Sequence, residues 1–121
     1  MAASYKDLTA WQKGIALAKE VYHFTKSYPI EELDGLTHLT RRTAVLVPCK
    51  IAAAHAVGSA NFFHSNLCKA EGLLAELETL IAVARELDFC TEDQKANVNA
   101  LILTEQRLVN QLFVKAGRKS K

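Results

Sequence analysis

Apolar residues recur at alternating steps of three and four along most of the chain, which is the spacing of one face of an α-helix. The pattern is clearest in the second half of the chain, where it runs without a miss for three heptads. Its members are Phe63, Leu67, Ala70, Leu74, Leu77, Ile81 and Ala84. A repeat of 3.5 residues favours nearly antiparallel helices with left-handed packing. This stretch therefore predicts one long helix of a helical bundle.

Three breaks divide the pattern into four segments of similar length. The first is Tyr28-Pro29, because proline disfavours helix in the residue before it. The second is Gly58-Ser59, a glycine followed by a candidate N-cap. The third lies at Thr91, which has the spacing of a capping box with Gln94. The predicted helices span residues 7–27, 34–57, 60–88 and 92–115, and a basic tail follows at residues 116–121.

The first and fourth segments also carry apolar stripes. In the first segment the predicted core stripe is Leu8, Trp11, Ile15, Ala18 and Tyr22. In the fourth it is Val98, Leu101, Glu105, Leu108 and Leu112, with a second stripe beside it at Ile102, Val109 and Phe113. One position of the fourth stripe, Glu105, is polar.

The second segment is apolar nearly all the way round from residue 43 to residue 57. A helix of this kind is buried on every side, yet each helix of a four-helix bundle leaves one side to water. The surplus points to contact with another subunit. The predicted oligomer interface is Val47, Pro48, Ile51, Ala53, Ala54 and Val57. As an alternative, Val45-Leu46-Val47 alone also fits a strand or loop.

Composition agrees with a single all-α domain over residues 1–121. A chain of this length has too few residues for two cores, and two prolines with five glycines are too few for the turns of an all-β fold. The start lacks the apolar run of a signal peptide. The longest nearly apolar stretch, residues 51–63, is too short to span a bilayer. We therefore expect a cytoplasmic protein.

Catalytic and metal-binding patterns are represented only by fragments. Glu20 and His23 form a single Glu-x-x-His pair, whereas a di-iron bundle needs two. His64 and Cys68 have the spacing of two ligands on one helix face but lack an obvious third. The chain has no Gly-x-Ser-x-Gly, Gly-rich phosphate loop or His-Glu-x-x-His. We predict no enzyme activity, no catalytic or metal site and no cofactor.

The three cysteines are an odd number at wide spacing, which argues against a disulfide framework. We expect Cys49, Cys68 and Cys90 to be buried free thiols.

Charge is distributed unevenly although the net charge is only +2. Residues 35–70 carry four basic residues and no acid, and residues 106–121 carry five basic residues and no acid. An oligomer would repeat each basic surface and strengthen its attraction for phosphates. The predicted nucleic-acid contacts are Arg41, Arg42, Lys50, Lys115, Arg118, Lys119 and Lys121.

Two alternatives to nucleic-acid contact stay open. The basic tail can be a solvated chain end. Arg41 and Arg42 can form ion pairs with acids such as Glu76 or Glu78 across the bundle or across a subunit interface.

Several short stretches together resemble a known family. They are Tyr5-Lys6-Asp7-Leu8, Trp11-Gln12-Lys13, Gly35-Leu36-Thr37, Arg41-Arg42, Ala44-Val45, Val47-Pro48, Ile51-Ala52, Ser59, Phe63 and Gly72-Leu73-Leu74-Ala75-Glu76-Leu77-Glu78-Thr79. The chain resembles the bacterial four-helix-bundle proteins that are encoded in intervening sequences of large-subunit ribosomal RNA genes and were once labelled ribosomal. Where that family has Ser-Asn-Ile-Ala-Glu-Gly after the proline, this chain has Cys49-Lys50-Ile51-Ala52-Ala53-Ala54.

The resemblance implies an antiparallel up-down four-helix bundle in a ring-like homopentamer, with no established enzymatic activity. A distant relative is the accessory protein of diversity-generating retroelements, which binds nucleic acid and a reverse transcriptase. We therefore expect a non-enzymatic, homo-oligomeric interaction protein. The alternative is an accessory protein that binds RNA or DNA through a repeated basic surface.

Overall fold

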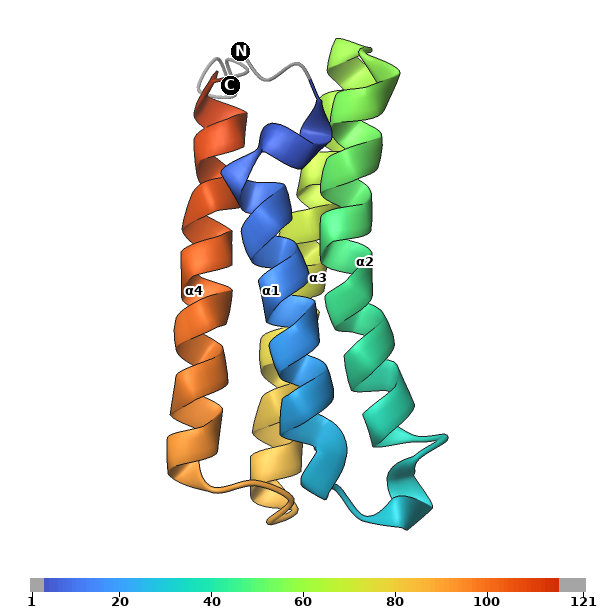
Figure 1. The fold of residues 1–121 in the computed structure, drawn as a ribbon, viewed down its shortest axis with the longest axis vertical. Coiled ribbons are helices and arrows are strands. Elements are labelled where there is room, and N and C mark those ends of the chain that lie inside the picture. The colour runs from blue at the N-terminus through green and yellow to red at the C-terminus, as the bar shows by residue number, and fades with distance from the viewer. Residues whose placement is uncertain (1–3, 116–121) are drawn as a thin grey trace.

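Four long helices make up the computed structural model, which describes residues 4–115. They are α1 (Thr9–Phe24), α2 (Leu36–Val57), α3 (Ala60–Glu86) and α4 (Glu92–Lys115), with short 3-10 turns at Tyr5–Asp7, Thr25–Ser27 and Ile30–Glu32. The helices lie side by side along the long axis (Figure 1). The α1–α2 and α3–α4 connections lie at one end of the bundle and the α2–α3 connection at the other. Residues 4–115 contain no strand, so the predicted all-α fold with four helices is confirmed.

The connection between α2 and α3 follows the predicted glycine and N-cap. Gly58 has a φ of 82°, in the left-handed region that glycine adopts without steric cost. The backbone N–H of Phe62 donates to Ser59 Oγ at 3.3 Å, so Ser59 caps the first turn of α3. Two residues are therefore enough to end one helix and begin the next.

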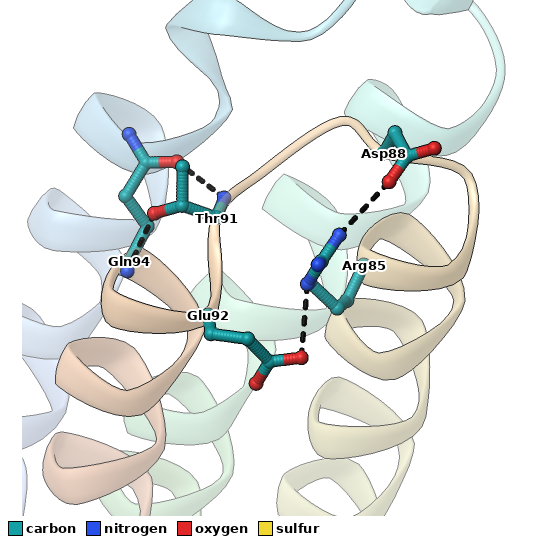
Figure 2. Close-up of polar contacts among 5 residues, drawn as sticks. All are labelled: Arg85, Asp88, Thr91, Glu92 and Gln94. Atoms are coloured by element: carbon teal, nitrogen blue, oxygen red, sulfur yellow. Dashed lines mark hydrogen bonds and ion pairs between the residues drawn. The ribbon is translucent and has the colours of Figure 1, made fainter.

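The start of α4 is the predicted capping box (Figure 2). The backbone N–H of Gln94 donates to Thr91 Oγ1 at 3.1 Å, and the backbone N–H of Thr91 donates to Gln94 Oε1 at 2.8 Å. These two bonds satisfy amide groups that have no partner within the helix. They fix the point at which the fourth helix begins.

The end of α3 is closed by Asp88, which has a φ of 62°. The N–H of Asp88 donates to the carbonyl of Arg85 at 3.0 Å, and the N–H of Phe89 donates to the carbonyl of Ala84 at 2.9 Å. This pair of bonds is a Schellman motif, in which glycine is the usual residue. The Arg85 guanidinium also contacts Asp88 and Glu92, each at 3.0 Å (Figure 2), and so links the two helices.

The core confirms the stripe predicted for α3. Six of its seven members are fully buried: Leu67, Ala70, Leu74, Leu77, Ile81 and Ala84. Phe63 is half-buried and packs against the same core. The 3.5-residue pattern therefore located the inner face of α3 correctly.

The stripe predicted for α1 was wrong for two of its five members. The buried face is Ala10, Gly14, Leu17, Val21 and Phe24, whereas Ile15 and Tyr22 are 46% and 45% exposed. Leu8, Trp11 and Ala18 are partly buried at its edge. Gly14 lies at the centre of the true face, where a Cβ atom would come within 3.1 Å of Pro48 Cβ. A glycine does not count as apolar in the sequence pattern, so the face that depends on it was missed.

The buried face of α4 is rotated about the helix axis relative to the predicted stripe. Its buried residues are Val98, Ile102, Glu105, Val109 and Phe113, which combine the second stripe with two members of the first. Leu101 is 40% exposed. Leu108 and Leu112 are half-buried at the edge of the core.

Candidate functional site

The residues predicted to form an oligomer interface are mostly inside the bundle. Val47, Pro48, Ile51 and Ala54 are buried within one chain, so they are not available to a neighbouring subunit. The apolar sequence of α2 is needed partly because α2 packs against both α1 and α3. Ala53 is half-buried and Val57 is exposed, and only these two of the six lie at the surface. The strand alternative for residues 45–47 is wrong, since they lie within α2.

A different set of α2 residues faces outward in the second half of this helix. Cys49, Ala52, Ala53 and Ala56 are spaced by three and four residues, which places them on one side of the helix, and each is half-buried or exposed. Together with Val57, these residues are here called the outer face of α2. These five side chains are small and uncharged, and half-buried Lys50 lies beside Ala53 and Val57 at the edge of the face. Short side chains at the centre of such a surface allow another helix to approach closely.

Arg41 is held against the end of α1 by neutral groups. Its Nε donates to Thr25 Oγ1 at 2.8 Å, and its Nη2 donates to the carbonyl of Tyr22 at 3.3 Å. The guanidinium also lies over the Tyr22 ring, with its Cζ 4.6 Å from the ring centroid, in the geometry of a cation–π interaction. This arginine is therefore fixed in place without a carboxylate.

Ion pairing does not explain Arg41 and Arg42. Among residues 4–115, neither arginine has a carboxylate oxygen within 4.0 Å, and the ion pairs found are those of Arg85. Glu78, one of the acids considered as a partner, instead accepts a hydrogen bond from Gln106 Nε2 at 3.2 Å. The alternative of pairing within the chain is thus wrong for the described residues.

The predicted nucleic-acid residues do not form one continuous patch. Arg41 and Arg42 lie in the first half of α2, near the end of the bundle that holds the α1–α2 connection, whereas α4 ends at Lys115 at the opposite end (Figure 1). Lys50 is half-buried between them. Arg118, Lys119 and Lys121, with the rest of the predicted tail, lie outside the described residues.

A buried acid occupies the centre of the bundle. Glu105 has no exposed surface, and neither of its carboxylate oxygens has a hydrogen-bond partner among the described residues. Burial raises the pKa of Glu105 to about 8, because a charge is disfavoured where water is excluded. The sequence showed this residue only as a polar position in an apolar stripe. Its isolation from other polar groups follows from the packing of three helices.

The cysteine and histidine fragments do not form a metal site in the described part of the chain. Cys68 Sγ lies 3.8 Å from His64 Nδ1, but no group of three or more potential ligands is found among residues 4–115. Cys90 is buried as expected, whereas Cys49 and Cys68 are exposed. The expectation of three buried thiols was therefore wrong for two of them.

None of the helices in residues 4–115 combines the length and the apolar character that crossing a membrane requires.

Comparison with known proteins agrees with the fold and the sequence resemblance. A search of curated proteins finds no match to the chain. Residues 6–111 match the model of a family described as 23S rRNA-intervening sequence protein. This match covers all of α1, α2 and α3 and most of α4. The chain belongs to the 23S rRNA-intervening sequence protein family.

Proposed function

We propose that this protein is a non-enzymatic interaction protein whose bundles assemble with copies of themselves through the outer face of α2. By resemblance to related proteins, the assembly is a ring-like homopentamer of antiparallel bundles. The observation that carries the proposal is the group of five small, uncharged side chains on the outer face of α2.

The exposure of the outer face supports a contact between subunits. Ala56 and Val57 are exposed, and Val57 is 56% exposed, so this surface is left uncovered by the chain's own helices. Contiguous exposed apolar surface is typical of sites at which proteins associate. A closed ring requires each subunit to offer this surface to a different patch on its neighbour.

The test is the absolute mass of the purified protein, measured by light scattering at low and high salt. We expect a stable multiple of 13.4 kDa under both conditions, because apolar contacts are not weakened by salt screening. Ala56→Glu should reduce the mass to that of one chain while the helical content persists, since it places an unpaired charge in the contact. Ala53→Glu should act in the same direction.

Ala100→Glu is the matched control, because Ala100 is exposed on α4. It should leave the mass unchanged. A wild-type protein with the mass of a single chain would overturn the proposed assembly. An Ala56→Glu protein that keeps the wild-type mass would show that the outer face of α2 is not the contact.

The second candidate is sequence-tolerant binding of RNA or DNA, as in an accessory protein that works with a reverse transcriptase. The observation that favours it is the lack of an acidic partner within 4.0 Å of Arg41 or Arg42 in the described chain. Binding of this kind weakens steeply as salt rises, because it releases counterions from phosphates. Retention of mixed RNA and DNA should therefore fall with salt and with Arg42→Ala. Absence of retained nucleic acid at moderate salt would overturn this candidate.

A further inference from the structure

We infer that the cavity between the end of α1 and the beginning of α2 binds a phosphate monoester, carried by a nucleotide or by the 5′ end of a nucleic-acid strand. The cavity has a volume of about 400 Å³, which lies within the range of roughly 300–1,000 Å³ typical of small-molecule sites. It lies on the first half of α2, whereas the proposed subunit contact lies on the second half. The inference therefore does not depend on the assembly.

Three nitrogen-bearing side chains line this cavity together. His38, Arg41 and Arg42 are spaced by three and four residues on α2, and this spacing places them on one side of the helix. A guanidinium presents a planar fork of N–H donors that matches the oxygen atoms of a phosphate. Two such forks and an imidazole on one wall provide several donors for one anionic group.

Arg41 is already in position before any ligand arrives. Thr25 Oγ1 accepts from its Nε, and the same hydroxyl group donates to the carbonyl of Val21 at 2.9 Å, so the hydroxyl is oriented by α1. With the bond from Nη2 to the Tyr22 carbonyl, these contacts use two of the five N–H groups of the guanidinium. The other three N–H groups have no hydrogen-bond acceptor among residues 4–115. A side chain that is already ordered loses less conformational entropy when it binds.

The charge of the cavity is not balanced by the chain itself. Within residues 4–115, Arg41 and Arg42 have no carboxylate within 4.0 Å, whereas Arg85 contacts two carboxylates at 3.0 Å each. Among the described residues that line the cavity, Asp34 is the single acid. Two arginines thus outnumber one acid in a partly enclosed space, and such a space concentrates anions.

The lining of the cavity also includes apolar side chains, which favour a ligand larger than inorganic phosphate. They are Leu33, Val45 and Leu46, of which Leu33 and Val45 are 51% and 37% exposed. A ligand with an apolar or planar body would cover these side chains and gain hydrophobic free energy. The combination of an anionic group and such a body describes a nucleoside monophosphate or the end of a strand.

Calorimetric titration of the full-length protein tests this inference with three probes. Adenosine 5′-monophosphate should bind most tightly, inorganic phosphate more weakly, and adenosine at least about tenfold more weakly than the monophosphate. Added salt should weaken the binding of the monophosphate. Adenosine that binds as tightly as the monophosphate would overturn the inference, as would the absence of binding by all three probes at millimolar concentration.

Two RNA oligonucleotides of the same sequence separate the sources of the phosphate. One carries a 5′-phosphate and the other a 5′-hydroxyl group. Tighter binding of the phosphorylated strand would identify a strand end as a ligand, and binding of the mononucleotide alone would identify a free nucleotide. Equal binding of both strands without binding of the mononucleotide would overturn the inference and favour contact with the backbone.

Single-residue variants test whether the monophosphate binds in this cavity. Arg42→Ala should weaken binding of the monophosphate about tenfold, as expected for the loss of a charge-assisted hydrogen bond. Arg41→Lys, which keeps the charge but loses the fork, should also weaken it. Arg107→Ala removes an exposed arginine of α4 and should leave the affinity unchanged. Equal losses for Arg42→Ala and Arg107→Ala would overturn the assignment. The mass of Arg42→Ala by light scattering reports separately on the assembly.

Discussion

The Oε2 atom of Glu105 lies 2.9 Å from the position that a Cβ atom would take at Gly14. The carboxyl group therefore occupies room that exists because α1 has no side chain there. Pro48 of α2 borders the same point, with its Cβ 3.1 Å from that position. Helices α1, α2 and α4 thus meet at a point where the packing of Gly14, Pro48 and Glu105 depends on the size of each side chain.

We expect Gly14→Ala to destabilise the protein by about 1–3 kcal/mol, the range typical of an overpacked core. The added methyl group would lie 2.9 Å from Glu105 Oε2 and 3.1 Å from Pro48 Cβ, so these neighbours must shift, and the Pro48 ring is bonded to the backbone of α2. Urea unfolding followed by circular dichroism measures the difference. Gly72→Ala is the matched control, because a Cβ atom at Gly72 would meet nothing within 4 Å. That change should stabilise α3 by up to about 1 kcal/mol through helix propensity. Equal effects of the two changes would contradict the close approach at Gly14.

Glu105 makes stability fall as pH rises from about 4.5 to about 8. Its pKa is raised from 4.5 to about 8 by burial, so the folded chain keeps a proton that the unfolded chain has already released. The unfolded state then binds fewer protons, and the free energy of unfolding falls by up to about 1.4 kcal/mol per pH unit. The full stability is present below pH 4.5, and this group causes no further loss above pH 8.

Urea midpoints near pH 5 and near pH 8 measure this loss. Glu105→Gln should remove most of the difference between the two midpoints, because its amide does not titrate. Glu86→Gln, at an exposed position, should retain the wild-type difference. A wild-type midpoint that does not change between these pH values would contradict a buried carboxyl without partners.

Asp88→Gly should stabilise the protein by about 0.5–1 kcal/mol. The φ of Asp88 is 62°, a conformation that glycine adopts more readily than any other residue. The lost ion pair with Arg85 offsets little of this gain, because the Asp88 side chain is 89% exposed and exposed pairs contribute little. Asp88→Asn, which removes the charge but tolerates the left-handed conformation, should change the thermal midpoint only slightly. A large loss in Asp88→Asn would show that the ion pair matters more than the backbone.

The sequence was most informative where one residue type decides the local structure. Gly58 and the Thr91–Gln94 capping box marked helix ends correctly, because each depends on neighbours along the chain. The inner face of α3 was also predictable, since its apolar residues are regularly spaced. The inner face of α1 was not predictable, because Gly14 lies at its centre and has no apolar side chain that the sequence pattern could show.

The cavity between α1 and α2 depends on contacts between segments that are distant along the chain. Arg41 and Arg42 were noticed as basic residues, but nothing in the sequence indicated that Thr25 would bind Arg41 across 16 positions. Neither did it indicate that Tyr22 would lie under the guanidinium. The Arg41 guanidinium becomes ordered only through these contacts, which form when α1 and α2 pack together.

The two-residue connection between α2 and α3 also bears on the order in which the chain folds. Closing so short a loop restricts few conformations, and α2 and α3 form the most extensive contact of any two helices. We expect this hairpin to form early, with α1 and α4 docking onto it afterwards. Contacts that are local in sequence speed folding. Lengthening the link at residues 58 and 59 should therefore slow refolding more than it speeds unfolding. The connection that separates two helices in the native state would then set the rate at which they come together.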